Sequence, residues 1–263
     1  MHRGFSFSAA SLLTVSTLFI PAAVASAETS VQVSADEFHE RVEAYQAENP
    51  KDYVGLEKLV ESLGGEFSVS TSITGETSAE EAMAINSEFD GQEAPSGMAT
   101  QSWPSDAFVV SVASSQHPSS PSASVSGYWN YRDDFVGQGS PYDIAALRFS
   151  DSCGQYSSYN AQTYNYQGTT TNRATLRSAG VGTSGPAWNI EDGVSGFVNY
   201  TDNGYVSVRY DLSECGGTVQ AAFDYEGNNG GSVLSVSAGW GGLSVSYSNP
   251  GLTLQKSSTA TTL

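Results

Sequence analysis

From Trp103 onward, short runs of alternating apolar and polar residues are separated by turn-forming residues, and this pattern constrains the fold most. The runs include 107–112 (AFVVSV), 125–131 (VSGYWNY) and 233–238 (VLSVSA). Alternate residues of a strand face opposite sides of a sheet, so each run predicts a half-buried strand. Roughly nine to eleven such strands, with turn signals about every 8 to 12 residues, predict an antiparallel β-sandwich of jelly-roll or immunoglobulin-like type over 103–263.

Two pairs of runs carry hairpin signals. Asp202-Asn203-Gly204 lies between 197–201 and 205–210, and Asn-Gly supplies the positive φ angles of a type I′ turn. The runs 219–225 and 233–238 flank a loop of glycine and asparagine, which predicts a second hairpin of the same kind. We expect Phe, Val, Leu and Ala to fill the space between two sheets, Trp129 among them, and the intervening Ser and Thr to face water.

Residues 28–102 follow a different pattern, with 16 acidic and 3 basic side chains and helix signals. Ser34 and Glu37 fit a capping box, and the apolar spacing after them predicts a helix. A second helix is expected over 53–63 and a short third one from Ser78, with an alternating run like an edge strand at 67–73 between them. The Gly, Pro and Ser of 89–102 predict a linker. The segment 28–88 is then a propeptide that is later removed, a permanent small subdomain or a partly disordered acidic arm.

The first 27 residues have the features of a signal peptide. Arg3 precedes an apolar run over 9–20, and Ala25-Ser26-Ala27 has the small-residue pattern of a cleavage site. We therefore expect a secreted, extracellular protein that begins at Glu28, with no membrane-spanning segment after it. The formal net charge of −18 argues against a nucleic-acid partner, because a duplex is bound by lysine and arginine.

The mature chain has two cysteines, Cys153 and Cys215, which in an oxidising compartment predict one disulfide. We expect no metal and no cofactor, because the chain lacks zinc-ligand spacing, a P-loop and a dinucleotide fingerprint. The oxygen-rich pairs Asp133-Asp134 and Asp202-Asn203 lack the order of a calcium loop. His117 lies in a Ser/Pro-rich loop, where we expect a solvated side chain.

Two groups of residues are candidates for function. Asp224 and Glu226 share one face of a strand at about the separation of a retaining glycosidase pair, although Glu226 also leads into a glycine loop. Four tyrosines in a Gln, Asn and Ser context have amphipathic rings that can stack on sugars or other flat ligands: Tyr156, Tyr159, Tyr164 and Tyr166.

These features favour a secreted, non-catalytic binding protein that acts on a polysaccharide or a surface protein. The first alternative is a secreted carboxylate-dependent hydrolase made as a precursor. The second is a pore-forming or toxin-like protein, because 233–238 and 243–247 alternate as a membrane hairpin does, although both are shorter than the roughly 10 residues that span a bilayer.

Overall fold

The computed structural model of the chain describes residues 33–90, 107–132, 142–165, 167–180, 185–191, 194–195, 198–199, 201–229, 231–248 and 252–263. These residues form three helices and a mainly antiparallel β structure, which confirms the predicted sandwich. The helices are α1 (Ala35–Glu48), α2 (Tyr53–Ser62) and α3 (Ala79–Asp90).

The sandwich consists of two sheets. The first has the order β2 (Gly75–Thr77), β1 (Glu66–Thr71), β3 (Phe108–Gln116), β4 (Ser122–Tyr131), β11 (Asn203–Asp211) and β6 (Gln155–Tyr164). The second has the order β15 (Leu252–Ser257), β12 (Gln220–Asn229), β5 (Asp143–Phe149), β8 (Ala187–Ile190) and β7 (Ala174–Ser178), with β16 (Thr261–Thr262) also beside β12. Two hairpins stand apart: β13 (Val233–Gly239) with β14 (Gly242–Tyr247), and β9 (Val194–Ser195) with β10 (Val198–Asn199).

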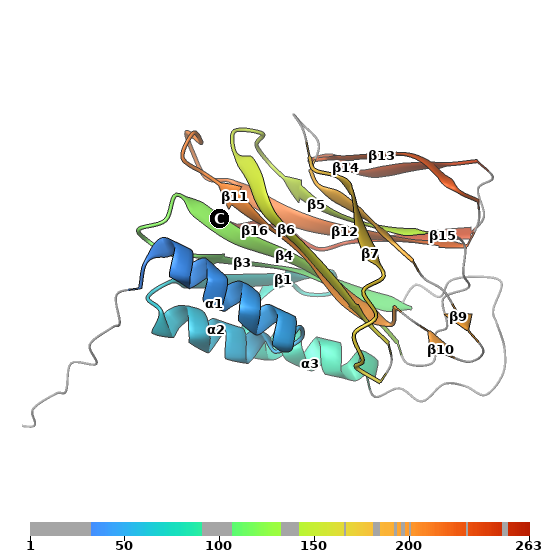
Figure 1. Ribbon diagram of the computed structural model, residues 1–263, viewed down its shortest axis with the longest axis horizontal. Helices are drawn as coiled ribbons and strands as arrows, with labels where there is room; N and C mark the ends of the chain where they lie inside the picture. Colours follow the sequence, from blue (N-terminus) through green and yellow to red (C-terminus); the bar gives the residue numbers. More distant parts are fainter. Residues whose placement is uncertain are drawn as a thin grey trace, which may run out of the picture.

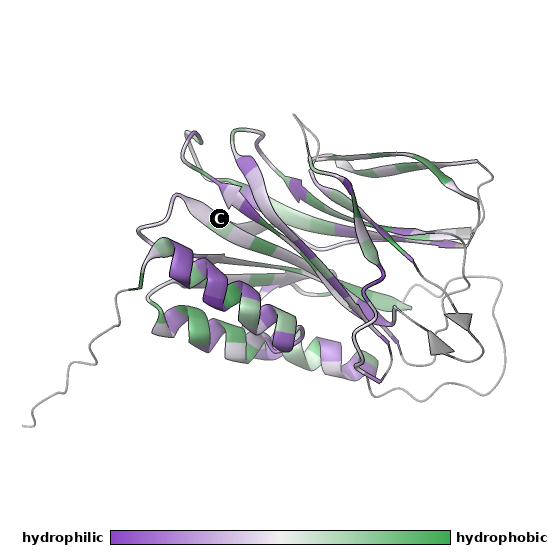
Figure 2. Cartoon of the chain, viewed as in Figure 1, coloured by the Kyte–Doolittle hydropathy of each residue, from purple (hydrophilic) through white to green (hydrophobic). Residues whose placement is uncertain are grey.

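Aromatic side chains fill the space between the two sheets. Trp129 of β4 is 1% exposed and stacks on Tyr225 of β12 with ring centroids 5.0 Å apart. Tyr131 lies in the same core, whereas Tyr128 belongs to a separate cluster on the opposite face of β4. The alternation that placed Trp129 inside is thereby confirmed, and green, apolar segments recur along the strands of both sheets between pale and purple ones in Figure 2.

The helices form where the sequence patterns predict them, and side chains cap the first turns of α1 and α2. Ser34 Oγ accepts a hydrogen bond from the Glu37 amide at 3.2 Å, and an Asp52 carboxylate oxygen accepts one from the Gly55 amide at 2.8 Å. All three helices cover the outer face of the first sheet (Figure 1). The strand β1, which follows α2 in the chain, pairs with β3 over six residues, so the N-terminal segment also extends this sheet.

The prediction that alternate serines face water is wrong for the first sheet, because the helices cover them. Side chains of α1 and α2 bind this face through hydrogen bonds: His39 to Ser124 at 2.7 Å, Gln46 to Ser126 at 2.9 Å, and Tyr53 to Ser111 at 2.6 Å. Hydrogen bonds of this kind offset much of the cost of burying a polar sheet face.

The predicted hairpin at Asn203-Gly204 is also wrong. Both residues lie inside β11, which pairs with β4 on one side and β6 on the other. Gly204 is placed there by packing and not by a turn, since a Cβ atom on it would lie 2.5 Å from the Trp129 ring. Neither do β12 and β13 pair across the loop between them. β12 continues to Asn229 beside β5 and β15, and β13 pairs with β14.

The β13–β14 hairpin packs on the outer face of the second sheet, on the side of the sandwich away from the helices (Figure 1). Ala238 and Leu243 of the hairpin contact Ile144, Ala146 and Ala187 of that sheet. The described residues therefore form four layers: helices, first sheet, second sheet and hairpin.

The helix α3 extends to Asp90, and Phe89 packs against Ile85 and Val109, so the start of the expected linker is helical. The rest of 89–102 and the signal peptide lie outside the described residues. The division into an N-terminal segment and a sandwich domain, and the removal of the segment, stay predictions. None of the helices in the described ranges has the length and apolar character needed to cross a membrane.

Candidate binding site beside the disulfide

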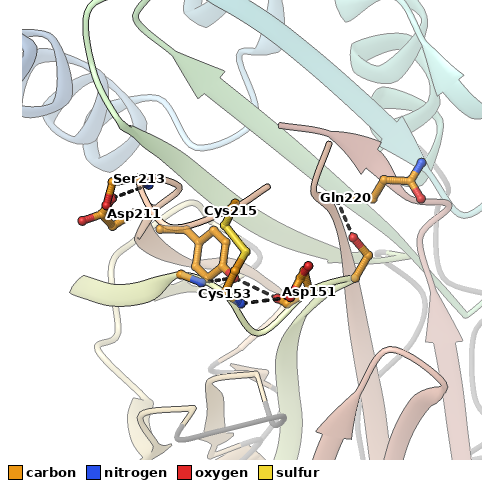
Figure 3. The surroundings of a disulfide bond; sticks show 9 residues. Asp151, Cys153, Asp211, Ser213, Cys215 and Gln220 are labelled. Carbon is orange, nitrogen blue, oxygen red and sulfur yellow. Dashed lines mark hydrogen bonds between the residues drawn. A yellow bond between two sulfur atoms is a disulfide. The ribbon is translucent and has the colours of Figure 1, made fainter. Parts of the chain in front are cut away.

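Cys153 and Cys215 form a disulfide, as predicted (Figure 3). Their Cα atoms are 5.1 Å apart, and the bond joins the loop between β5 and β6 to the loop that follows β11. Because these two loops lie at the same end of the sandwich, the disulfide holds them together there.

Hydrogen bonds hold the loop before Cys153 in a defined shape. The Tyr210 hydroxyl donates to the Asp151 carbonyl at 2.8 Å and accepts from the Gly154 amide at 2.9 Å. The Asp151 carboxylate accepts from the Cys153 amide at 3.1 Å. At the loop's start, the Ser150 amide and hydroxyl both bond to the backbone of Gln220. The loop therefore presents its exposed polar side chains from a rigid base (Figure 3).

A pocket of about 240 Å³ lies beside this loop. Its lining combines aromatic and polar side chains from three parts of the chain: Phe149, Ser150, Asp151, Ser152, Tyr156, Gly185 and Trp240. Tyr156 packs against the core through Phe149 and Tyr210, with ring centroids 5.2 and 5.1 Å apart, and burial raises the pKa of its hydroxyl. Flat rings beside hydroxyl and carboxylate groups suit a ligand with one apolar face and a polar edge.

Trp240 is 40% exposed at the tip of the β13–β14 hairpin. Arg148 of β5 holds it in two ways: Nη1 donates to the Trp240 carbonyl at 2.7 Å, and the guanidinium carbon lies 5.7 Å from the centroid of the indole ring. Two residues earlier in the hairpin, the Ala238 carbonyl accepts a hydrogen bond from the Gly185 amide at 2.6 Å. The exposed indole is thus a fixed wall of the pocket.

The two carboxylates predicted as a catalytic pair both bind groups that fasten this hairpin. Asp224 is fully buried and forms an ion pair with Arg148, whose Nε lies 2.5 Å from Oδ2. Glu226 accepts a hydrogen bond from the Tyr247 hydroxyl of β14 at 2.8 Å, and burial raises the pKa of its carboxyl. Neither residue lines the pocket, and their catalytic role stays a prediction.

The tyrosine group does not form one surface. Tyr156 and Tyr159 both pack against the central core, whereas Tyr164 lies under α1 and donates to the Ala47 carbonyl at 3.1 Å. A bulge causes this division, because β6 shifts register against β11 beside Ser158, whose φ is 50°. Tyr166 lies outside the described residues.

His117 is 7% exposed, so the prediction of a solvated side chain is wrong. Its ring lies 5.3 Å from that of Phe38 in α1, and Nδ1 bonds to the Ser119 hydroxyl at 2.7 Å. The helical layer buries this histidine, and nothing in the loop sequence itself indicates that the helices lie there.

A second pocket, of about 400 Å³, opens between the C-terminal ends of α1 and α3 and the start of β11. It includes Asp202 and Asn203, the pair considered for calcium. Lys51 bonds to Asp90 there at 2.7 Å, and Asn130 donates to the same carboxylate at 3.0 Å. Within the described ranges, no cluster of three or more His, Cys, Asp and Glu side chains could hold a metal ion.

Most residues of this pocket were missed from the sequence, Asp151 and Trp240 among them, and so was Arg148, which holds Trp240 without lining the pocket. Trp240 carries the one signal that could have found it, since it lies among glycines at a hairpin turn, where a large aromatic residue has no strand face to fill.

Comparisons with protein families and with curated protein sequences give no match. Among solved structures, one on pH-induced modulation of Streptococcus parasanguinis adhesion by Fap1 fimbriae is 9% identical, covers 74% of this chain and 95% of its own, and has a TM-score of 0.31. A structure described as a pore forming protein is 6% identical, covers 73% of this chain and 89% of its own, and has a TM-score of 0.31. The KRT10-binding region domain of the pneumococcal serine rich repeat protein PsrP is 13% identical, covers 73% of this chain and 98% of its own, and has a TM-score of 0.27. Such scores are too low to establish a shared fold or function.

Proposed function

We propose that this chain is a secreted, non-catalytic binding protein that holds one unit of an extracellular polysaccharide in the pocket beside the disulfide. The observation that carries the proposal is the exposed indole of Trp240, fixed at the pocket wall opposite a rigid loop with Asp151. A pyranose ring has an apolar face that stacks on an indole and hydroxyl groups that donate to a carboxylate. A disulfide is itself typical of proteins that work outside the cell.

The charge of the pocket narrows the ligand class. Asp151 is the one charged side chain among its described lining residues, and the chain carries a net charge of −18. An acidic sugar would meet repulsion both at the site and during approach. We therefore expect a neutral sugar or an amino sugar, and weak binding of uronic-acid or sulfated polymers.

Two contacts favour binding over hydrolysis. The Asp224 carboxylate faces Arg148, and the Glu226 carboxylate accepts a hydrogen bond from Tyr247, so each is engaged beneath the hairpin. A general acid or nucleophile has to reach the scissile bond, and carboxylates that are buried against Arg148 and Tyr247 do not.

The test is affinity electrophoresis through gels that contain a neutral glucan, a mannan, glycol chitin or alginate. We expect one of the first three polymers to retard the chain and alginate not to do so. Trp240→Ala should weaken that binding by roughly thirtyfold, the effect of truncating a central aromatic anchor. Leu234→Ala is the matched control, because Leu234 is 62% exposed on the same hairpin but does not line the pocket.

Equal retardation of both variants would place the ligand elsewhere, and no retardation in any gel would favour a protein ligand. Release of reducing ends from the polymer would instead support the hydrolase, and leakage of dye from liposomes would support the pore former.

A further inference from the structure

Arg148 is bound on both sides of its guanidinium group. Toward the sheet, Nε lies 2.5 Å and Nη2 3.0 Å from the two carboxylate oxygens of Asp224. Toward the hairpin, Nη1 donates to the Trp240 carbonyl at 2.7 Å. The planar, forked shape of guanidinium makes this three-point arrangement possible, whereas a lysine ammonium is a compact point charge on a flexible stem.

Because both charged groups are buried, this ion pair contributes little to the stability of the fold by itself. Asp224 is fully buried, and the Arg148 side chain is 10% exposed. The loss of hydration of two buried charges cancels much of their attraction, so apolar residues of similar volume often replace such a pair without loss of stability. What apolar residues cannot do is donate a hydrogen bond to a carbonyl on a neighbouring layer.

One other described side-chain bond lies near the tip, where Gln255 donates to the Leu243 carbonyl at 3.2 Å without reaching Trp240, and the rest lie further away. Tyr247 bonds to Glu226, and Arg177 reaches the Val233 and Leu234 carbonyls at 3.4 and 3.3 Å. At the tip, the backbone bond from Gly185 to Ala238 fixes the chain two residues before Trp240 but leaves the indole itself unconstrained.

We propose that Asp224 and Arg148 act as a latch that positions Trp240 and thereby sets the affinity of the pocket, an inference that rests on the binding function proposed above. Asp224 orients Arg148, and Arg148 fixes both the backbone and the ring of Trp240. An indole that is already in place when the sugar arrives loses less freedom on binding, which raises affinity without any added contact. Both are positioning residues, and neither touches the ligand.

The test compares the wild-type chain with two variants. The double change Arg148→Met with Asp224→Leu replaces the pair by apolar side chains and should leave the denaturation midpoint nearly unchanged. Arg148→Lys keeps a positive charge opposite Asp224 but loses the fork that reaches Trp240, and it serves if the double variant does not fold.

Acrylamide quenching of Trp240 fluorescence is the first measurement, made without ligand. The same chain with Trp240→Phe supplies the signal of the other tryptophans, which is subtracted. We expect the indole to become more accessible to the quencher in both variants. Affinity for the retarding polysaccharide should fall by roughly three- to tenfold, the effect of freeing one side chain at a binding site.

Unchanged quenching would overturn the latch, and so would unchanged affinity in variants whose indole had become accessible. If no polysaccharide binds even the wild-type chain, the binding function fails, whereas a change in quenching still supports the hold of Arg148 on Trp240. The two proposals are thereby distinguishable.

Discussion

The indole of Trp129 lies directly against the backbone of Gly204 on the neighbouring strand. A Cβ atom at this position would come within 2.5 Å both of the Trp129 ring and of the Gln162 carbonyl, and neither group can move without shifting the sheet. This glycine therefore serves the packing of the largest core side chain, not the flexibility of a turn.

Gly204→Ala should lower the free energy of unfolding by about 1 to 3 kcal/mol, the usual effect of overfilling a packed core. Gly216→Ala is the matched control, since a Cβ atom there meets nothing within 4 Å. Urea denaturation of both variants measures the difference. An equal midpoint for Gly204→Ala and Gly216→Ala would contradict the packing role of Gly204.

The same residue shows where sequence reasoning succeeds and where it fails. The face of Trp129 follows from alternation alone, because neighbouring residues of a strand point to opposite sides. The role of Gly204 does not follow, because Asn-Gly is equally suited to a turn, and only the position of β4 and β6 on either side decides between the two readings.

At the scale of elements, α1 docks on the first sheet through an uncharged histidine. His39 is 1% exposed, with Nδ1 bonded to Ser124 and Nε2 bonded to Ser120 at 3.1 Å. Burial, and then the nearby positive charge of Arg209, lower the pKa of His39 from 6.5 to about 4. The negative charge of Asp36 raises the pKa of His39, and His117 lowers it further.

Acidification should therefore loosen α1. Between pH 6.5 and about 4, the unfolded chain binds a proton at His39 that the folded chain does not, so stability falls as the pH decreases through this range. His39→Gln keeps a polar side chain but removes the titration, and its stability should fall less between pH 7 and pH 5. Urea midpoints at the two pH values measure this difference, and parallel curves for the two proteins would contradict it.

The helices themselves could be predicted, because the Ser34 cap and the apolar spacing after it are local signals. Their position over the serine face could not, since alternating serines are equally typical of a strand that faces water. The strand β6 could not be predicted for a related reason: its polar residues interrupt the apolar alternation, and pairing with β11 determines its structure. The site at the disulfide depends on contacts between β5 and the distant hairpin, which no local pattern contains.

At the scale of the whole molecule, the disulfide closes a loop over a sequence separation of 62 residues. Replacing both cysteines by serine should lower the free energy of unfolding by about 4 kcal/mol, because the unfolded chain regains the freedom of that loop. Saccharide affinity should fall as well, since Asp151 lies two residues before Cys153. Guanidinium denaturation and affinity electrophoresis of the double serine variant measure both effects, and an unchanged midpoint would contradict the first.

The strand β1 also shields six of the nine residues of β3, to which it is paired along one side. If processing removed the N-terminal segment, β3 would expose a row of unpaired amide and carbonyl groups, the template on which strands of separate molecules join. Cleavage would then favour edge-to-edge association of the shortened chains, so the segment would also keep the sandwiches apart.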